Sequence, residues 1–232
     1  ARNGRATGSV KLEGQEILNL PVGQLNRLRG QVMTMVFQDP LTALTPHLRV
    51  GEQMAEVLSV HGGITGRAAR ARSLDWLDKV RMPDAARRLT QFPHELSGGQ
   101  RQRVMIAMAM LMEPRLLIAD EPTTALDVTV QAEILDLMAE LQRSENTAIA
   151  LITHDMGVVA RMCDRIEVMR HGAYVESGAV EDIFYRPAHA YTRTLLDAMP
   201  RLNSPVAPPI PPQGAPILTA RNVQVHFPVR LA

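Results

Sequence analysis

The chain has 232 residues, of which 46% are hydrophobic and 21% charged, a composition that can bury the core of a soluble α/β domain. Its 25 basic and 24 acidic residues give a net charge of +1, so no electrostatic argument favours a nucleic-acid partner. The single cysteine, Cys163, excludes an internal disulfide and an iron–sulfur cluster, and no apolar run reaches the roughly 20 residues that span a bilayer.

The first half of the chain changes from strand patterns to helical ones. Residues 9–18 predict a short hairpin, and residues 32–37 predict a buried strand that ends at Gln38. Helices are expected at residues 50–61, 67–81, 85–92 and after Gln100. This stretch predicts a helical subdomain inserted into a sheet, with Trp76 and most of the methionines of the last helix in its core.

In the second half, residues 116–120 and 148–153 return to strand patterns. The helix expected between them has one buried face, formed by Ile134, Leu137, Met138 and Leu141. Strand, helix and strand predict a right-handed parallel crossover. Asp127 and Asp155 stand where N-caps are expected, each directly before a helical pattern.

Two segments hold residue types that suit phosphate chemistry. Ser97, Gly98 and Gly99 directly precede a long apolar helix, so backbone N–H groups and the helix dipole would face an incoming phosphate. Asp120 and Glu121 end an apolar run, as in a parallel strand that delivers carboxylates to the ligand-binding edge of an α/β sheet. We expect Arg101 and Arg103 to lie on the solvent-facing or phosphate-facing side of the helix.

Residues 96–103, 116–122 and 125–127 resemble the signature, Walker B and D-loop motifs of ABC-type ATPases. The resemblance implies a truncated P-loop NTPase domain of the α/β class, with a RecA-like parallel sheet core and an inserted helical subdomain. It implies ATP and Mg²⁺ as ligands. The residues that it assigns to catalysis are Glu121, His154 and Gln38; to Mg²⁺, Asp120 and Gln38; and to ATP, Ser97, Gly98, Gly99, Gln100 and Asp127.

One of these assignments has a plain alternative. Gln38 alone would be read as a surface glutamine before a turn, and only the order and spacing of the motifs favour a site. The six histidines other than His154 show no metal-ligand spacing.

The printed sequence contains no G-x-x-x-x-G-K-[ST] pattern, the loop with which this kind of site cradles phosphates. Its only lysines are Lys11 and Lys79. In the family this loop lies upstream of the segment that residues 8–14 match. We therefore expect a piece of a longer protein that starts after its phosphate loop and is inactive alone.

Residues 183–196 resemble the C-terminal hallmark of oligopeptide and dipeptide importer ATPases, with Ala190 in place of a proline. Residues 19–21 and 49–53 are also similar to that group. A groove beside Gln38 is expected to dock the permease, and Leu41 and Leu44 would either line this groove or belong to the core. In Leu44-Thr45-Pro46 an asparagine commonly precedes the proline, and this departure affects the detail of docking.

The expected layout has five parts: residues 1–40, a partial ATPase core; 41–113, the helical subdomain; 114–202, the rest of the core; 203–216, a proline-rich linker; and 217–232, the possible first strand of a second ABC domain. For the last part, an exposed tail is the alternative. The resemblance implies a subunit that powers peptide import from the cytoplasmic face of the bacterial inner membrane.

The partners that it implies are a second ABC ATPase domain, transmembrane permease subunits and, indirectly, a peptide-binding protein. An ABC importer of glutathione or nickel and a non-transport ABC ATPase remain as alternatives. A non-catalytic interaction module is a further one.

Overall fold

Three parallel strands form the central sheet of the chain. The computed structural model describes residues 6–38, 43–124, 126–199 and 219–224. The strands are β3 (Met33–Val36), β4 (Leu116–Asp120) and β5 (Ala148–Ile152), in the order β3-β4-β5. Both pairings are parallel, with Val36 opposite Ala119 and Asp120 opposite Ile152. The α/β fold class with a parallel sheet is confirmed.

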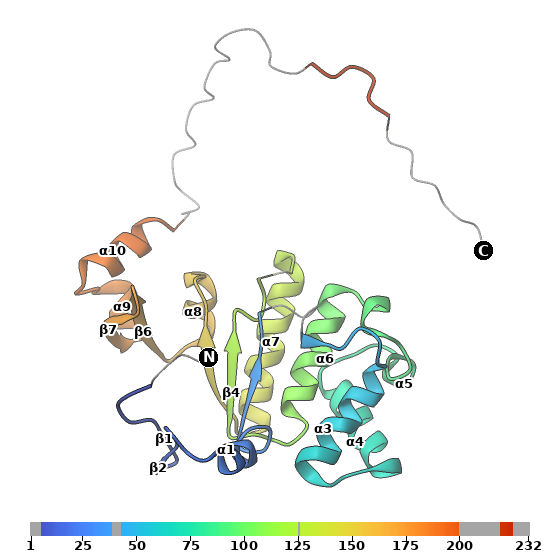
Figure 1. Ribbon diagram of the computed structural model, residues 1–232. Helices are drawn as coiled ribbons and strands as arrows, with labels where there is room; N and C mark the ends of the chain where they lie inside the picture. The colour runs from blue at the N-terminus through green and yellow to red at the C-terminus, as the bar shows by residue number, and fades with distance from the viewer. Residues whose placement is uncertain (1–5, 39–42, 125, 200–218, 225–232) are drawn as a thin grey trace. The chain divides into compact units, whose positions relative to one another are not determined.

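Two long helices, α6 (Gly98–Met110) and α7 (Val128–Ser144), pack on one face of this sheet (Figure 1). Side chains alternate across a strand, and Val36, Leu117 and Ala119 turn to the helices and are buried. The predicted apolar face of α7 is confirmed, since all four of its members are buried: Ile134, Leu137, Met138 and Leu141. Burial of these two faces against each other fixes the register of the strands.

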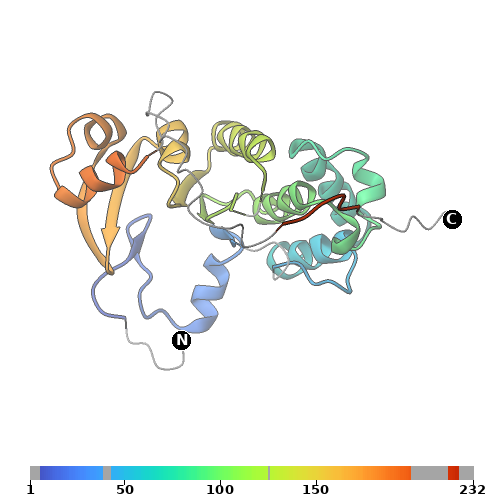
Figure 2. The same cartoon turned by 90° about the horizontal axis from the view of Figure 1, so that it is seen from above.

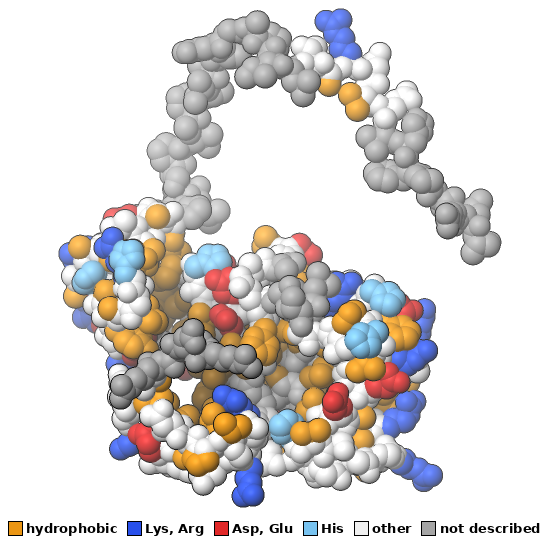
Figure 3. All heavy atoms as spheres, viewed as in Figure 1, with side chains coloured by type: hydrophobic (Ala, Val, Ile, Leu, Met, Phe, Trp, Pro, Cys, Tyr) orange, Lys and Arg blue, Asp and Glu red, His pale blue; other side chains and the backbone are white. Residues whose placement is uncertain are grey.

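The opposite face of the sheet is exposed in the described part of the chain. Met35 is 37% and Ile152 52% exposed, and Ala148 and Ala150 are also exposed. Figure 3 shows hydrophobic side chains around a hollow in the middle of this side of the molecule. Parallel sheets are normally covered on both faces, because their strands are apolar on both sides. The expectation of a fully buried strand at residues 32–37 is therefore met on one face only.

The predicted helical subdomain is present. It contains α3 (Val50–Gly62), α4 (Gly66–Lys79), α5 (Ala85–Arg88) and the 3₁₀ turn η1 (Pro93–Glu95), followed by α6. Figure 2 shows these helices gathered at one end of the sheet. Trp76 is fully buried, as expected, and Met105 and Met110 are buried with it in one continuous core. Leu44 is also part of this core, at 2% exposure.

Two details of the subdomain differ from the prediction. The helix expected at residues 85–92 ends at Arg88, because the carbonyls of Leu89 and Gln91 accept hydrogen bonds from the first N–H groups of α3. The expectation for Arg101 and Arg103 is wrong. Arg101 donates from Nε to the Pro93 carbonyl, and Arg103 donates to the Val80 carbonyl and to Glu133. Both arginines therefore join α6 to neighbouring segments.

Short elements flank the sheet at both ends of the chain. The predicted N-terminal hairpin is confirmed as β1 (Lys11–Leu12) and β2 (Gln15–Glu16), and α1 (Val22–Leu28) follows it. The C-terminal elements are α8 (Met156–Met162), β6 (Arg165–Arg170), β7 (Ala173–Ala179), α9 (Val180–Tyr185) and α10 (Ala190–Asp197). They pack around a second apolar cluster that includes Ile166, Val168 and Ile183.

The chain divides into two units, Ala1–Asp197 and Ala198–Ala232. In the second unit residues 198–199 and 219–224 are described, and they form no strand. The strand expected from residue 217 onward is therefore not formed at residues 219–224. The proline-rich linker and the rest of the expected strand lie outside the described residues. Within the described parts, no helix is long and apolar enough to cross a bilayer.

The burial of Leu44 leads to a stability prediction. Leu44→Asp places an unpaired charge in the core, and we expect it to lower the free energy of unfolding by roughly 3 kcal/mol or more. Urea denaturation of the purified chain measures this loss. Val60→Asp, at a position that is 70% exposed on α3, is the matched control and should change stability little. An unchanged unfolding midpoint for Leu44→Asp would instead favour the docking role for this residue.

Candidate active site

Three polar side chains meet where the three strands of the sheet end. Gln38 follows β3, Glu121 follows β4, and His154 follows β5. Gln38 donates from Nε2 to Oε2 of Glu121 at 2.9 Å, and Nδ1 of His154 lies 2.8 Å from Oε1 of the same carboxylate. The structure therefore brings together the three residues expected to serve catalysis. Their catalytic roles stay predictions.

The backbone places Glu121 in this position. Its φ of +44° lies in the left-handed region, which an L side chain rarely adopts. The Glu121 N–H donates to the Ile152 carbonyl at 2.8 Å, which extends the β4–β5 pairing by one residue. This bond holds the turn against its strain, of order 1–3 kcal/mol for such a conformation. The turn directs the carboxylate toward the ends of the neighbouring strands.

The hydrogen bonds around Glu121 favour its ionised form. The hydrogen bond to His154 lowers the pKa of Glu121 below its ordinary value, and a second bond, from the Thr124 hydroxyl, lowers it further. Thr124 donates from Oγ1 to Oε2 at 2.8 Å. Donors that stabilise a carboxylate lower its pKa, and here they outweigh desolvation. Sequence reasoning missed Thr124, since only the turn brings a residue three positions away back to the carboxylate.

Asp120, the expected metal ligand, ends β4 with its carboxylate in no hydrogen bond or ion pair to another described residue. A carboxylate without a protein partner suits a hard cation such as Mg²⁺. No group of three His, Cys, Asp or Glu side chains gathers in the described parts of the chain. Mg²⁺ does not require such a group, because it usually keeps waters and takes phosphate oxygens as further ligands.

The signature segment forms the N-terminus of α6. Ser97 is the N-cap, and its Oγ accepts from the Gln100 N–H while Oε1 of Gln100 accepts from the Ser97 N–H. This capping box commits the Gln100 side chain to the helix. Asp127 is likewise committed, since its carboxylate accepts from the N–H groups of Thr129 and Val130 at the start of α7. The expected capping roles of Asp127 and Asp155 are confirmed.

Within the described residues, no hydrogen bond or ion pair joins the signature segment to the cluster of Gln38, Glu121 and His154. The two predicted groups of ligands are therefore not joined by such a contact among the described residues. A Cβ on Gly99 would lie 2.6 Å from Cγ1 of Val130, whereas one on Gly98 would lie 3.6 Å from Leu126. Gly99 thus lets α6 approach α7 closely, and Gly98 has ordinary contact distances.

Residues 49–53, which are similar in sequence to the peptide-importer group, have a structural role. Gln53 is buried, and its amide donates to the carbonyls of Thr45 and Leu48 and accepts from the Thr45 N–H. A Cβ on Gly51 would lie 2.9 Å from the Leu89 carbonyl oxygen. These contacts hold residues 45–48, the loop downstream of Gln38, on the helical subdomain. Leu41, the other proposed docking residue, lies outside the described residues.

The C-terminal hallmark is held by one carboxylate. Glu176 on β7 accepts from the N–H groups of Ala188 and His189, directly before α10. Nδ1 of His189 in turn accepts from the Tyr191 N–H, which makes this histidine the N-cap of α10. Arg170 lies over the Tyr191 ring at 4.7 Å. The motif residues His189 and Tyr191 therefore fix α10 against the β6–β7 hairpin, and sequence reasoning missed Glu176.

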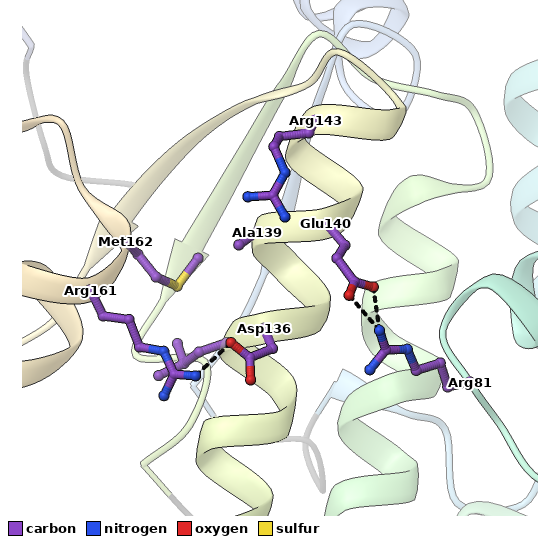
Figure 4. Close-up of a pocket in the computed structure, with 8 residues that line it drawn as sticks. Arg81, Asp136, Ala139, Glu140, Arg143, Arg161 and Met162 are labelled. Carbon is purple, nitrogen blue, oxygen red and sulfur yellow. Dashed lines mark hydrogen bonds and ion pairs between the residues drawn. The ribbon is translucent and has the colours of Figure 1, made fainter.

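A cleft of about 320 Å³ lies elsewhere, beside α7 (Figure 4). Two ion pairs line it, Arg81 with Glu140 and Arg161 with Asp136, and the Arg143 side chain reaches over it. None of the predicted site residues lines this cleft. The candidate site is instead the open edge of the sheet, where a ligand would be exposed on one side.

The close approach at Gly99 gives a prediction with an internal control. Gly99→Ala should destabilise the chain by about 1–3 kcal/mol, because overpacking displaces Val130. Gly98→Ala meets no clash and should be neutral or stabilising, since Ala favours a helix over Gly by up to about 1 kcal/mol. The double change Gly99→Ala/Val130→Ala should recover much of the loss. Equal unfolding free energies for the two single variants would contradict the packing role of Gly99.

Comparisons with known proteins agree with this arrangement. The pattern of the family described as "ABC transporter" matches residues 2–124, and that described as "Oligopeptide/dipeptide transporter, C-terminal region" matches residues 175–222. The oligopeptide transport ATP-binding protein OppD of Salmonella typhimurium is 55% identical over 219 residues, which cover 94% of this chain and 63% of the relative. OppD of Bacillus subtilis is 51% identical over 85% of this chain and 55% of its own length. The chain thus spans less than two thirds of these relatives.

Solved structures share the fold. The dimeric ATP-binding cassette MJ0796 bound to ADP and Pi matches with a TM-score of 0.66 and 28% identity, over 75% of this chain and 74% of that one. CbiO1 from Clostridium perfringens matches with a TM-score of 0.66 and 28% identity, over 78% and 69%. The family pattern covers more than half of the residues, and the structure has the parallel sheet and helical subdomain expected from the motifs. The chain belongs to the ABC transporter family of ATP-binding proteins.

Proposed function

We propose that the protein of which this chain forms part hydrolyses ATP at the carboxyl edge of the central sheet. The observation that carries the proposal is the convergence of Gln38, Glu121 and His154 from three adjacent strands. Open α/β sheets bind their ligands at this edge. At this open edge each of the three side chains can still reach a ligand. A purely structural hydrogen-bond network would not need to lie there.

Glu121 orients and polarises the attacking water in this proposal. The bonds that lower its pKa keep it ionised at neutral pH, so it is available as an acceptor. A carboxylate with a lowered pKa is a weak base, and its contribution is therefore positioning and electrostatic polarisation more than full proton abstraction. His154 holds the Oε1 side of the carboxylate, and Gln38 holds the Oε2 side.

Asp120 is the proposed ligand of Mg²⁺, with Gln38 as a second oxygen donor. The free carboxylate of Asp120 at the end of β4 fits a cation of this kind. Bound Mg²⁺ would neutralise charge on the phosphates of ATP. This chain holds the Asp120 carboxylate next in sequence to Glu121 and gives it no competing protein partner.

The signature residues Ser97, Gly98 and Gly99 are proposed to bind the nucleotide of a second ATPase unit. The first turn of a helix has backbone N–H groups without intrahelical partners, and these suit a phosphate. Their separation from the Glu121 cluster supports two half-sites in one chain. The solved relative MJ0796 is described as a dimer bound to ADP and Pi, which supports the same arrangement. Gln100 and Asp127 would shape this half-site through their caps.

The proposed cargo is an oligopeptide or dipeptide. The relatives at 55% and 51% identity carry the name oligopeptide transport ATP-binding protein, and the C-terminal pattern belongs to the same transport group. The protein would then act at the cytoplasmic face of the bacterial inner membrane, on permease subunits that receive peptide from a binding protein. The packing of α10 by Glu176, His189 and Tyr191 supports the proposal, since it gives the importer hallmark a defined structure.

The first test is a change at Glu121 in the full-length protein. Glu121→Gln keeps shape and removes charge, so hydrolysis should fall by roughly two to four orders of magnitude while ATP binding persists. Single-turnover hydrolysis by this half of the assembly is the measurement, since a second intact site would mask the loss. Glu56→Gln, an exposed change on α3, is the control and should leave the rate unchanged. Near-normal turnover in Glu121→Gln would reject the role.

The second test concerns the cargo. The full-length protein, reconstituted with its permease subunits in proteoliposomes, should hydrolyse ATP faster when a peptide-loaded binding protein is added. We expect a several-fold rise with peptide and none with the empty binding protein. Stimulation by glutathione or nickel, but not by peptides, would assign another cargo and contradict the peptide proposal.

A further inference from the structure

We propose that Thr124 is a positioning residue for Glu121, which it serves by fixing the plane of the Glu121 carboxylate. The inference rests on the proposed ATPase function and adds to it a residue outside the expected set. Thr124 lies on the turn between β4 and α7, and its hydroxyl donates to Oε2 of Glu121 at 2.8 Å. Nothing in the motif assignments from sequence gave this residue a role.

The carboxylate of Glu121 is held from two sides. Oε2 accepts from both Thr124 and Gln38, at 2.8 and 2.9 Å, while Oε1 faces His154. A carboxylate offers about four acceptor positions, so three are filled and about one remains for water. Because both Oε2 positions are taken, the remaining position lies on Oε1. A water molecule can therefore bind the Glu121 carboxylate only from the side of Oε1.

A restraint of this kind is needed because the last torsion of a glutamate is broad. Rotation about χ3 is not limited to staggered wells, so the rotamer alone does not fix the carboxylate plane. The side chain of Glu121 is 22% exposed at the edge of the sheet, so packing covers it only in part. Gln38 contributes a bond, but it comes from the end of another strand. Thr124 supplies a bond from the same turn.

The turn that carries Thr124 is itself well anchored. The Thr124 N–H donates to the Glu121 carbonyl and the Leu126 N–H donates to the Thr123 carbonyl, while Pro122 and Thr123 are buried. A β-branched side chain has few χ1 rotamers, so the hydroxyl has a restricted direction. Thr124 itself is exposed, and packing therefore does not explain its side chain. The hydroxyl is the part of the residue that acts on the site.

The kinetic test separates positioning from binding in the full-length protein. Thr124→Val keeps the shape and removes the donor, so we expect kcat for ATP hydrolysis to fall about tenfold with KM within about twofold. Thr124→Ser restores the hydroxyl and should recover kcat to within about threefold of the wild type. Thr129→Val is the matched control, at an exposed threonine whose hydroxyl makes no hydrogen bond to a described residue. An unchanged kcat in Thr124→Val would overturn the proposal.

A second measurement does not depend on turnover. In the nucleotide-free full-length protein, the ¹³C signal of the Glu121 carboxylate should shift in Thr124→Val and return in Thr124→Ser. An unmoved signal in Thr124→Val overturns the proposal whatever the rates are. If the wild type hydrolyses no ATP, the proposed function fails, and the carboxylate signal still decides whether Thr124 orients Glu121. A loss of kcat that Ser does not rescue would also contradict the role of the hydroxyl.

Discussion

The parallel pairing of β3, β4 and β5 is the constraint on which the candidate site depends. In a parallel sheet all carboxyl ends lie at one edge, so residues 38, 121 and 154 meet there although more than a hundred positions separate the first from the last. The pairing also fixes which strand residues face α6 and α7. A shift of one residue would exchange the buried and exposed faces of a strand and remove its side chain from the site.

The strain at Glu121 is a local consequence of the same pairing. Its left-handed backbone is held by the extra hydrogen bond to Ile152, and the turn after it is held by Pro122 and Thr123 in the core. Strained residues persist where the surrounding structure determines them, and they are frequent at functional sites.

The helical subdomain is tied to the site through the segment after Gln38. Leu44 is anchored in the subdomain core, and Gln53 holds residues 45–48 through three hydrogen bonds. A movement of the subdomain would therefore be transmitted to the chain just downstream of Gln38, which contacts Glu121. The capping box at Ser97 fixes the start of α6, and the close contact at Gly99 packs this helix against α7.

The sequence by itself determined the type and order of the main elements. Apolar periodicity placed α7 and its buried face correctly, and the capping side chains of Asp127 and Asp155 located the starts of α7 and α8, because these signals act within one turn of helix. The family motifs named the three side chains that converge on the sheet edge.

Only the tertiary structure decided what depends on contacts between distant segments. Leu44 belongs to a buried cluster that also contains residues of α3, α4 and α6, and Arg103 joins three segments because its donors reach Val80 and Glu133. Glu176 has no local signal, since its partners lie twelve and thirteen residues away on another element. The hydroxyl of Thr124 reaches Glu121 only because Glu121 takes a left-handed conformation, and no periodicity in the sequence encodes that turn.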